Sequence, residues 1–182
     1  MKRVCLYGAS SDKLAQEYYD GAYAVGKALA EHNIGLVFGG GATGLMGAAC
    51  RGAHSSGGEI IGIAPKFFDE EGVLFQECTE LIFTETMRQR KQKMEELSDA
   101  FIVTPGGIGT LEEFMEIYTL RQLKRHEKPI TILNINGYYN QMIGFLQNMV
   151  EQGFMSEHCL DLFAVFDEPD ALIAYLKDKL GE

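Results

Sequence analysis

Residues 105–113 (PGGIGTLEE) combine the residue types of an anion-binding site with a neighbouring carboxylate. They follow the apolar run 100–104, which predicts a buried strand, and precede an amphipathic helix predicted over 114–123. Glycines let the backbone approach a ligand closely, and the N–H groups and dipole of a helix N-terminus favour an anion. Glu113 places a carboxylate beside this site. The pattern therefore predicts chemistry on a small phosphorylated molecule.

Glu113 also fits a purely structural role. Thr110 and Glu113 have the spacing of a capping box, in which the Glu side chain accepts from the N-cap N–H, and this spacing alone favours capping. A plain capping box does not need three preceding glycines, however, so the whole segment favours a functional role. In either role, the helix N-terminus and nearby cationic groups favour the ionised carboxylate. An ionised carboxylate suits stabilisation of a cation or activation of water.

A second candidate segment opens a helix at 87–97, with Thr86 as the predicted N-cap and Gln89 completing a capping box. One helix face carries four residues at the spacing i, i+3, i+4 and i+7, namely Met87, Arg90, Lys91 and Met94. We expect Arg90 and Lys91 to bind a ligand. The alternative is that their stems cover the edge of the core while their charged groups reach water. Arg88 lies off this face and is expected in solvent.

The glycine-rich turn 39–44 (GGGATG) fits the GxGxxG pattern of dinucleotide sites. It follows the second predicted strand rather than the first, and the next strand ends at Ala64-Pro65, where such sites carry an acidic residue for the ribose. Its possible roles are an NAD site, tight strand–helix packing, or a loop that contacts a nucleotide, with Gly41 as a candidate contact. Ser10, in the turn 8–11, either donates to a phosphate or caps the next helix.

Short apolar strands alternate with helices along the chain. Strands are predicted at 3–7, 34–38, 59–64, 81–84, 100–103, 129–133 and 162–166, and helices at 14–31, after the turn 39–47 to about 55, and at 87–97, 114–123, 139–152 and 169–180. This alternation predicts an α/β fold, a Rossmann-like doubly wound parallel sheet with helices on both faces, as a single domain over 1–182. Ligands bind such sheets at the carboxyl ends of the strands, where the turns 8–11, 39–47 and 105–110 meet. Residues 66–79 lack a clear period and are predicted to form a loop over one end of the sheet.

The composition narrows the function classes. Asp and Glu number 26 against 16 Lys and Arg, a net charge of −10, which argues against nucleic acid as a partner but not against a small anion. No run approaches the ~20 apolar residues of a membrane span. Four separated cysteines with no CxxC pair and no secretory leader predict free thiols and a cytoplasmic location. The scattered histidines predict no metal site.

With these segments in view, the chain resembles the LOG family of nucleotide phosphoribohydrolases, formerly described as lysine decarboxylases. The family signature PGGxGTxxE matches 105–113 at every fixed position, and GGGxxGLMG matches 39–47. The signature MHxRK matches 87–91, with Arg88 in place of the histidine. After Pro65, where plant members carry an acidic residue that contacts the nucleotide, this chain has Lys66-Phe67-Phe68.

The resemblance implies a Rossmann-like homodimer that hydrolyses the N-glycosidic bond of adenosine-type 5′-monophosphates to free base and ribose 5-phosphate. In plants and many bacteria the preferred bases are N6-prenylated adenines, the cytokinins. The family's catalytic pair falls on Arg90 and Glu113, with no metal or organic cofactor. Together, the residues and the resemblance select as substrate-binding candidates Ser10, Gly41, Met87, Lys91, Gly106, Gly107, Ile108, Gly109, Thr110, Leu111, Glu112 and Thr119.

Residue chemistry and resemblance agree on a mechanism. Glycoside cleavage passes through an oxocarbenium-like sugar, so Glu113 is expected to stabilise that cation and to orient or deprotonate water. Arg90 is expected to position the nucleotide and ease departure of the base. The alternatives are a non-catalytic nucleotide carrier or sensor, favoured only by the missing histidine at position 88, an oxidoreductase using residues 39–44, and a decarboxylase with a lysine–pyridoxal phosphate imine.

Overall fold

The computed structural model describes residues 1–70 and 72–182. In these residues a central sheet of seven strands forms the framework of the fold. The strands are β1 (Arg3–Tyr7), β2 (Gly35–Phe38), β3 (Ile60–Pro65), β4 (Glu80–Thr84), β5 (Ala100–Val103), β6 (Ile130–Leu133) and β7 (Ala164–Phe166). Their order is β4-β3-β2-β1-β5-β6-β7, and each neighbouring pair is parallel. The predicted doubly wound parallel sheet is confirmed.

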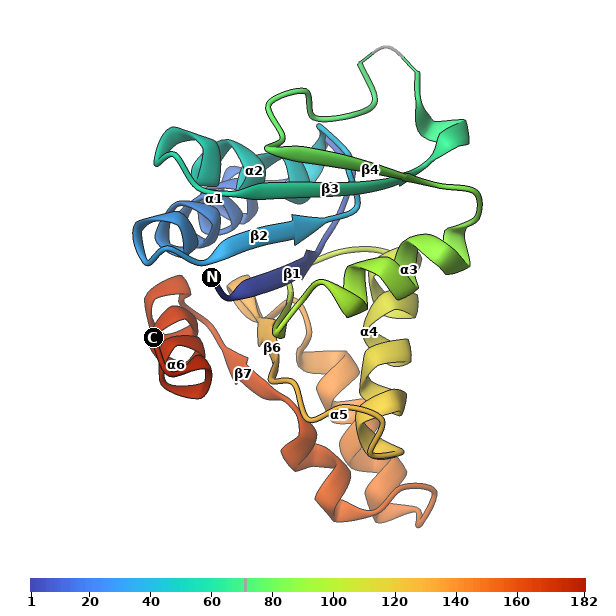
Figure 1. Ribbon diagram of the computed structural model, residues 1–182. Coiled ribbons are helices and arrows are strands. Elements are labelled where there is room, and N and C mark those ends of the chain that lie inside the picture. Colours follow the sequence, from blue (N-terminus) through green and yellow to red (C-terminus); the bar gives the residue numbers. More distant parts are fainter. Residues whose placement is uncertain (71) are drawn as a thin grey trace.

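Helices cover both faces of the sheet (Figure 1). They are α1 (Gln16–Glu31), α2 (Gly44–Ser55), α3 (Met87–Glu96), α4 (Ile108–Gln122), α5 (Asn140–Glu151) and α6 (Pro169–Leu180), with short 3₁₀ turns at Lys66–Phe68, Ile135–Gly137 and Glu157–Leu162. Helices α1, α2 and α6 pack on one face, and α3, α4 and α5 pack on the other. In the described residues, no helix is both long and apolar enough to cross a lipid bilayer.

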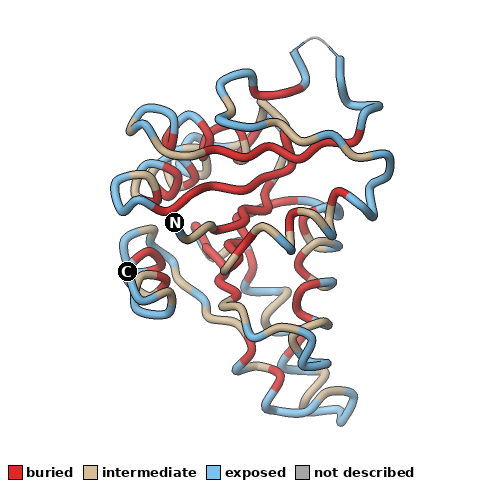
Figure 2. Tube along the Cα trace, in the orientation of Figure 1, coloured by how far each residue is buried: buried red, intermediate tan, exposed pale blue. Residues whose placement is uncertain are grey.

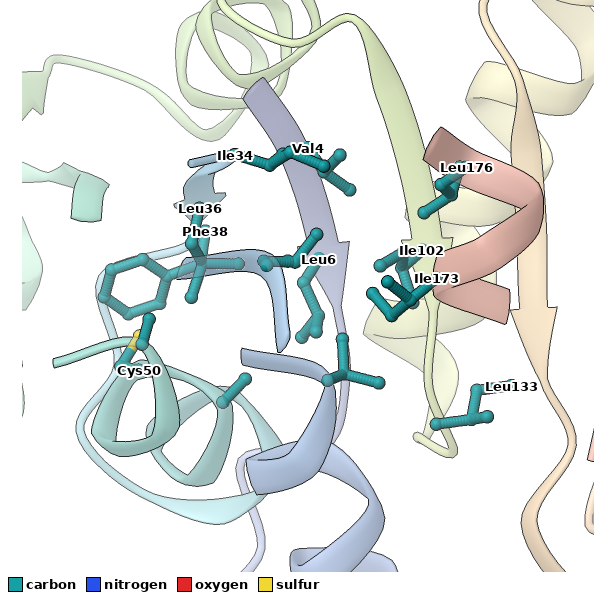
Figure 3. Close-up of a cluster of buried hydrophobic side chains, with 14 of the residues drawn as sticks. Val4, Leu6, Ile34, Leu36, Phe38, Cys50, Ile102, Leu133, Ile173 and Leu176 are labelled. Carbon is teal, nitrogen blue, oxygen red and sulfur yellow. The ribbon is translucent and has the colours of Figure 1, made fainter. Parts of the chain in front are cut away.

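Each face of the sheet has its own hydrophobic core, because successive side chains of a strand point to opposite faces. In β1, Val4 and Leu6 join the core under α1, α2 and α6, whereas Cys5 and Tyr7 join the core under α3, α4 and α5. Figure 3 shows the first core, where Leu6 lies among side chains from β2, β5 and α6. Apart from Arg3 at the start of β1, the residues of the five inner strands are buried (Figure 2), which explains their continuous apolar sequence.

Most element boundaries lie within two residues of the prediction, and the starts of α4 and β7 differ for identifiable reasons. Helix α4 begins at Ile108 rather than at residue 114, because its first turn faces the ligand edge and lacks the apolar pattern of a packed face; Ile108 is 83% exposed. Strand β7 begins at Ala164 because the preceding residues 157–162 form a 3₁₀ turn.

The strand order reverses between β1 and β5. At this point Ala9, after β1, donates its N–H to the Pro105 carbonyl after β5, at 3.1 Å. A ligand site is expected at such a switch point, beyond the carboxyl ends of the strands.

Candidate active site

A cleft of about 560 Å³ lies at the switch point between β1 and β5. Its walls come from the turns after β1 and β2, the loop after β3, and the first turns of α3 and α4. The volume is within the range of small-molecule sites. The three turns that the sequence placed at one edge of the sheet therefore meet at a single cavity.

Most of the predicted site residues line this cleft. They are Ser10, Gly41, Met87, Arg90, Gly107, Ile108, Gly109, Thr110, Glu112 and Glu113. Leu111 instead packs against the core under α4, and Thr119 is exposed on α4, about two and a half turns beyond Thr110. Gly106 lines a smaller neighbouring pocket of about 260 Å³ with Tyr18 and Tyr138.

Lys91 is also outside the cleft lining. Its ammonium group pairs with the carboxylates of Glu112 and Glu116, the latter at 2.8 Å. Burial alone lowers the pKa of Lys91, but these two carboxylates outweigh burial and raise it. The ligand-binding role predicted for Arg90 and Lys91 stays a prediction. Arg90 lines the cleft, whereas Lys91 joins α3 to α4.

The lining includes residues that the sequence analysis did not select, namely Gly8, Ala9, Gly39, Thr43, Met46, Phe68, Val73 and Leu74. The last three belong to the loop after β3, which has no periodic pattern to indicate its position. Two backbone hydrogen bonds fix this loop to the glycine turn: Ala42 N–H donates to the Val73 carbonyl and Phe75 N–H to the Gly40 carbonyl, each at 2.9 Å.

Arg90 and Glu113, which both line the cleft, form a buried ion pair. Arg90 Nη1 lies 2.9 Å from Glu113 Oε1, and their side chains are 6% and 11% exposed. Arg90 Nε also donates to the Ile63 carbonyl at 3.1 Å, and Nη2 to the Gly39 carbonyl at 3.4 Å. With acceptors from three separate elements, the guanidinium is held in one position before a ligand binds.

Gly39 makes room for this guanidinium. A Cβ at position 39 would lie 2.8 Å from Arg90 Cζ and closer still to Nη2. Elsewhere in the turn, Gly40 (φ +84°) and Gly44 (φ +64°) adopt the left-handed conformation that favours glycine. Part of the glycine pattern thus has a packing role.

The N-terminus of α2 counts against a dinucleotide site in the turn 39–44. In a dinucleotide fold the pyrophosphate occupies this helix N-terminus. Here Gly44 N–H donates to the carboxylate of Asp12 at 3.0 Å. One of the donors that a pyrophosphate needs is therefore used by a side chain of this chain.

Among residues 1–70 and 72–182, no side chain caps the N-terminus of α4 in this way. Its N-cap residue is Gly107, which has no side chain that could cap the helix. The first hydrogen bond within the helix runs from Leu111 N–H to the Gly107 carbonyl at 3.0 Å. The N–H groups of residues 107–110 therefore have no partner within the helix, and this end faces the cleft. The alternative capping box at Thr110 and Glu113 is wrong, because both residues lie inside the helix and Glu113 pairs with Arg90.

Burial raises the pKa of Glu113 above its ordinary value of 4.5, although Arg90 opposes the shift. The sequence had led us to expect that neighbouring cations and the helix N-terminus would favour the ionised form. In the structure, desolvation raises the pKa of Glu113 by more than the neighbouring Arg90 and Lys91 lower it. A carboxylate with a raised pKa is a stronger proton acceptor than an exposed one.

Comparison of the sequence with known proteins finds one matching family model and relatives that share more than a third of its residues. A family model described as "Possible lysine decarboxylase" matches residues 46–176. The probable cytokinin riboside 5′-monophosphate phosphoribohydrolase LOGL2 of Oryza sativa subsp. japonica is 38% identical over 177 residues, covering 97% of this chain and 72% of the relative. For the Arabidopsis thaliana cytokinin riboside 5′-monophosphate phosphoribohydrolase LOG3, the identity is also 38%, covering 97% of this chain and 82% of the relative.

Solved structures share the fold at lower identity. A molybdenum cofactor carrier protein of Chlamydomonas reinhardtii has a TM-score of 0.77 at 22% identity, covering 100% of this chain and 99% of that one. The molybdenum cofactor binding protein of Rippkaea orientalis has a TM-score of 0.76 at 20% identity, covering 99% and 98%. These likenesses concern the fold alone. The family model and the relatives at 38% identity show the family as well as the fold. The chain belongs to the LOG family.

Proposed function

We propose that the protein is a phosphoribohydrolase that cleaves the N-glycosidic bond of adenosine-type nucleoside 5′-monophosphates. The observation that carries this proposal is one cleft containing both an uncapped helix N-terminus and a buried Arg90–Glu113 pair. The first feature suits a phosphate and the second suits chemistry on the attached sugar. The names of relatives at 38% identity support the same reaction.

The 5′-phosphate binds at the N-terminus of α4 in this proposal. Backbone N–H groups of residues 107–110 donate to it, and the helix dipole adds partial positive charge. The overall charge of −10 does not prevent this, because the donors are local and preorganised. Binding energy from the phosphate then orients the ribose over Glu113.

Glu113 and Arg90 act on the sugar. As the bond between C1′ and the base nitrogen breaks, its electron pair leaves with the base and positive charge develops on the ribose. The Glu113 carboxylate stabilises that charge and accepts a proton from the water whose oxygen attacks C1′. Arg90 fixes the carboxylate and helps to position the nucleotide and ease departure of the base. The departing base nitrogen gains one proton, which balances the proton that Glu113 takes from the water. The products are free base and ribose 5-phosphate, and no cofactor is required.

The lining of the cleft also includes apolar side chains, namely those of Met46, Phe68, Val73 and Met87. These side chains suit a flat purine, and we propose adenine or an N6-substituted adenine as the base. Lys91 and Thr119 remain predicted nucleotide contacts, although neither lines the cleft of the single chain. The homodimer implied by the family resemblance also remains a proposal.

Base release tests the proposal directly. Purified protein is incubated with AMP and with N6-isopentenyladenosine 5′-monophosphate, and free base is followed by chromatography. We expect release from at least one nucleotide. Glu113→Gln should bind the nucleotide yet lower turnover about 10²- to 10⁴-fold, since the proton acceptor is lost. The matched control is Glu127→Gln, which changes an exposed carboxylate outside the cleft and should leave turnover unchanged. Unchanged turnover in Glu113→Gln would remove Glu113 from the mechanism.

The carrier or sensor function is the second candidate, because Arg88 replaces the family histidine. Arg88 is exposed and does not line the cleft. This position weakens the only argument for a non-catalytic protein. Tight nucleotide binding without release of base from either substrate would nevertheless favour the carrier.

A further inference from the structure

Three consecutive carbonyl groups of the loop before α4 accept hydrogen bonds. Tyr139 Oη donates to the Thr104 carbonyl at 2.8 Å, and Tyr138 Oη donates to the Gly106 carbonyl at 2.7 Å. Between them, the Pro105 carbonyl accepts from Ala9 N–H at 3.1 Å. Two adjacent tyrosines therefore hold the loop on both sides of its proline.

The bond to Gly106 determines the direction of a neighbouring donor. In a planar trans peptide, the carbonyl of one residue and the N–H of the next point in opposite directions. Because Tyr138 holds the Gly106 carbonyl, the N–H of Gly107 is directed away from Tyr138. Tyr138 lines the small pocket on one side of the loop, and Gly107 also lines the cleft. The Gly107 N–H, the first donor of α4, is thereby presented to the cleft.

A Gly-Gly segment needs this constraint. Without Cβ atoms, the Gly106–Gly107 peptide can rotate between orientations at little steric cost. The flipped orientation would aim the Gly106 carbonyl oxygen, rather than an N–H, at a bound anion. The Tyr138 hydroxyl opposes that rotation by giving the carbonyl a partner on the opposite side.

Tyr138 is itself held in place, although 47% of it is exposed. Its ring contacts Tyr18 and Tyr139 edge-on, with centroids 6.1 and 4.9 Å away. The turn that presents it is fixed by the buried Asn134, whose Oδ1 accepts from Tyr139 N–H at 2.7 Å and whose Nδ2 donates to Asn140 Oδ1 at 2.8 Å. The aromatic contacts and this turn both restrict where the hydroxyl can lie.

We propose that Tyr138 is a positioning residue for the anion-binding loop, acting through its hydroxyl on the Gly106–Gly107 peptide. The inference rests on the proposed function to the extent that the ligand is a phosphomonoester. Tyr138 touches neither the sugar nor the base in this proposal. Its effect is confined to the affinity for the phosphate group.

The test uses Tyr138→Phe, which removes the hydroxyl and keeps the ring. Calorimetry with AMP, inorganic phosphate and adenosine is carried out in a Glu113→Gln background, so that AMP is not consumed. We expect the Kd of AMP and of phosphate to rise about 3- to 10-fold, the size expected for one hydrogen bond, while adenosine binding does not change. The matched control is Tyr23→Phe, which removes an exposed hydroxyl bonded to Ser55 at 3.0 Å and should change none of the three affinities.

Two results would overturn the inference. One is unchanged affinity for AMP and phosphate in Tyr138→Phe. The other is an equal loss for AMP, phosphate and adenosine together with a lower Tm, which would mean a general structural role. Failure of the proposed function gives a different result, because the parent protein then releases no base whatever Tyr138→Phe does.

Discussion

Replacing Gly39 with alanine should disable the Arg90–Glu113 pair without removing either charge. Gly39 lies outside the left-handed backbone region, so alanine is compatible with its conformation. The added Cβ would lie 2.8 Å from Arg90 Cζ and closer to Nη2, where an ordinary contact is 3.4–4 Å. The guanidinium must therefore move by roughly 1–2 Å to restore van der Waals separation.

A movement of that size is large for this site. It exceeds the tolerance of the 2.9 Å bond from Arg90 Nη1 to Glu113 and of the 3.1 Å bond from Nε to the Ile63 carbonyl. A misplacement of about 1 Å in a catalytic group can cost about 10²-fold in rate. We therefore expect kcat/KM for base release to fall about 10²-fold in Gly39→Ala. The Tm should fall by only several degrees, because both charges remain and can pair again in a shifted position.

The assay is steady-state release of base from AMP, measured beside thermal unfolding of the same samples. Gly144→Ala is the matched control, since a Cβ at this position in α5 meets no atom within 4 Å. It should leave the rate unchanged. A Gly39→Ala protein with kcat/KM within threefold of the parent and an unchanged Tm would refute the reasoning, because the Arg90 position would then not determine the rate.

Two further predictions concern pH and assembly. Burial favours the neutral form of Glu113, and the carboxylate must be ionised to accept a proton, so kcat/KM should fall as the pH drops through the raised pKa. The acid limb of the pH profile should therefore have an apparent pKa above 4.5, and a limb at or below that value would contradict the assignment. Light scattering of the purified protein should give twice the 20.2 kDa mass of one chain, and a monomer at micromolar concentration would contradict the proposed homodimer.

The strands and the position of the site could be predicted from the sequence because both follow from local patterns. Buried parallel strands are continuous apolar runs, and the bounds of β1 and β5 agree with the prediction. Glycine turns at strand ends meet at one edge of a parallel sheet by geometry alone. Helical spacing also placed Arg90 and Lys91 on one face, since rotation about a helix axis is fixed by sequence separation.

The features of the site that could not be predicted from the sequence depend on which elements become neighbours in the fold. Helical spacing does not tell which partner each side chain meets, so Lys91 was not distinguished from Arg90. The capping pattern at Thr110 failed because α4 begins one turn earlier, at a glycine cap. The direction of the Glu113 pKa shift was missed because desolvation depends on packing, whereas only charges can be read from a sequence. Phe68 was missed because its loop is held in place by backbone hydrogen bonds. Such bonds do not require particular side chains, so the sequence carries no pattern that would indicate them.

The contacts of Arg90 also bear on the cooperativity of folding. Its guanidinium, on α3, binds carbonyls that belong to β3 and to the turn after β2, together with a carboxylate on α4. These partners lie on opposite sides of the point where the strand order reverses. The pair therefore forms only after the two halves of the sheet have docked. A chain with only the first half folded can form the contacts of Arg90 to these two carbonyls but not its pair with Glu113. The complete reactive geometry is therefore gained and lost together with the complete tertiary structure.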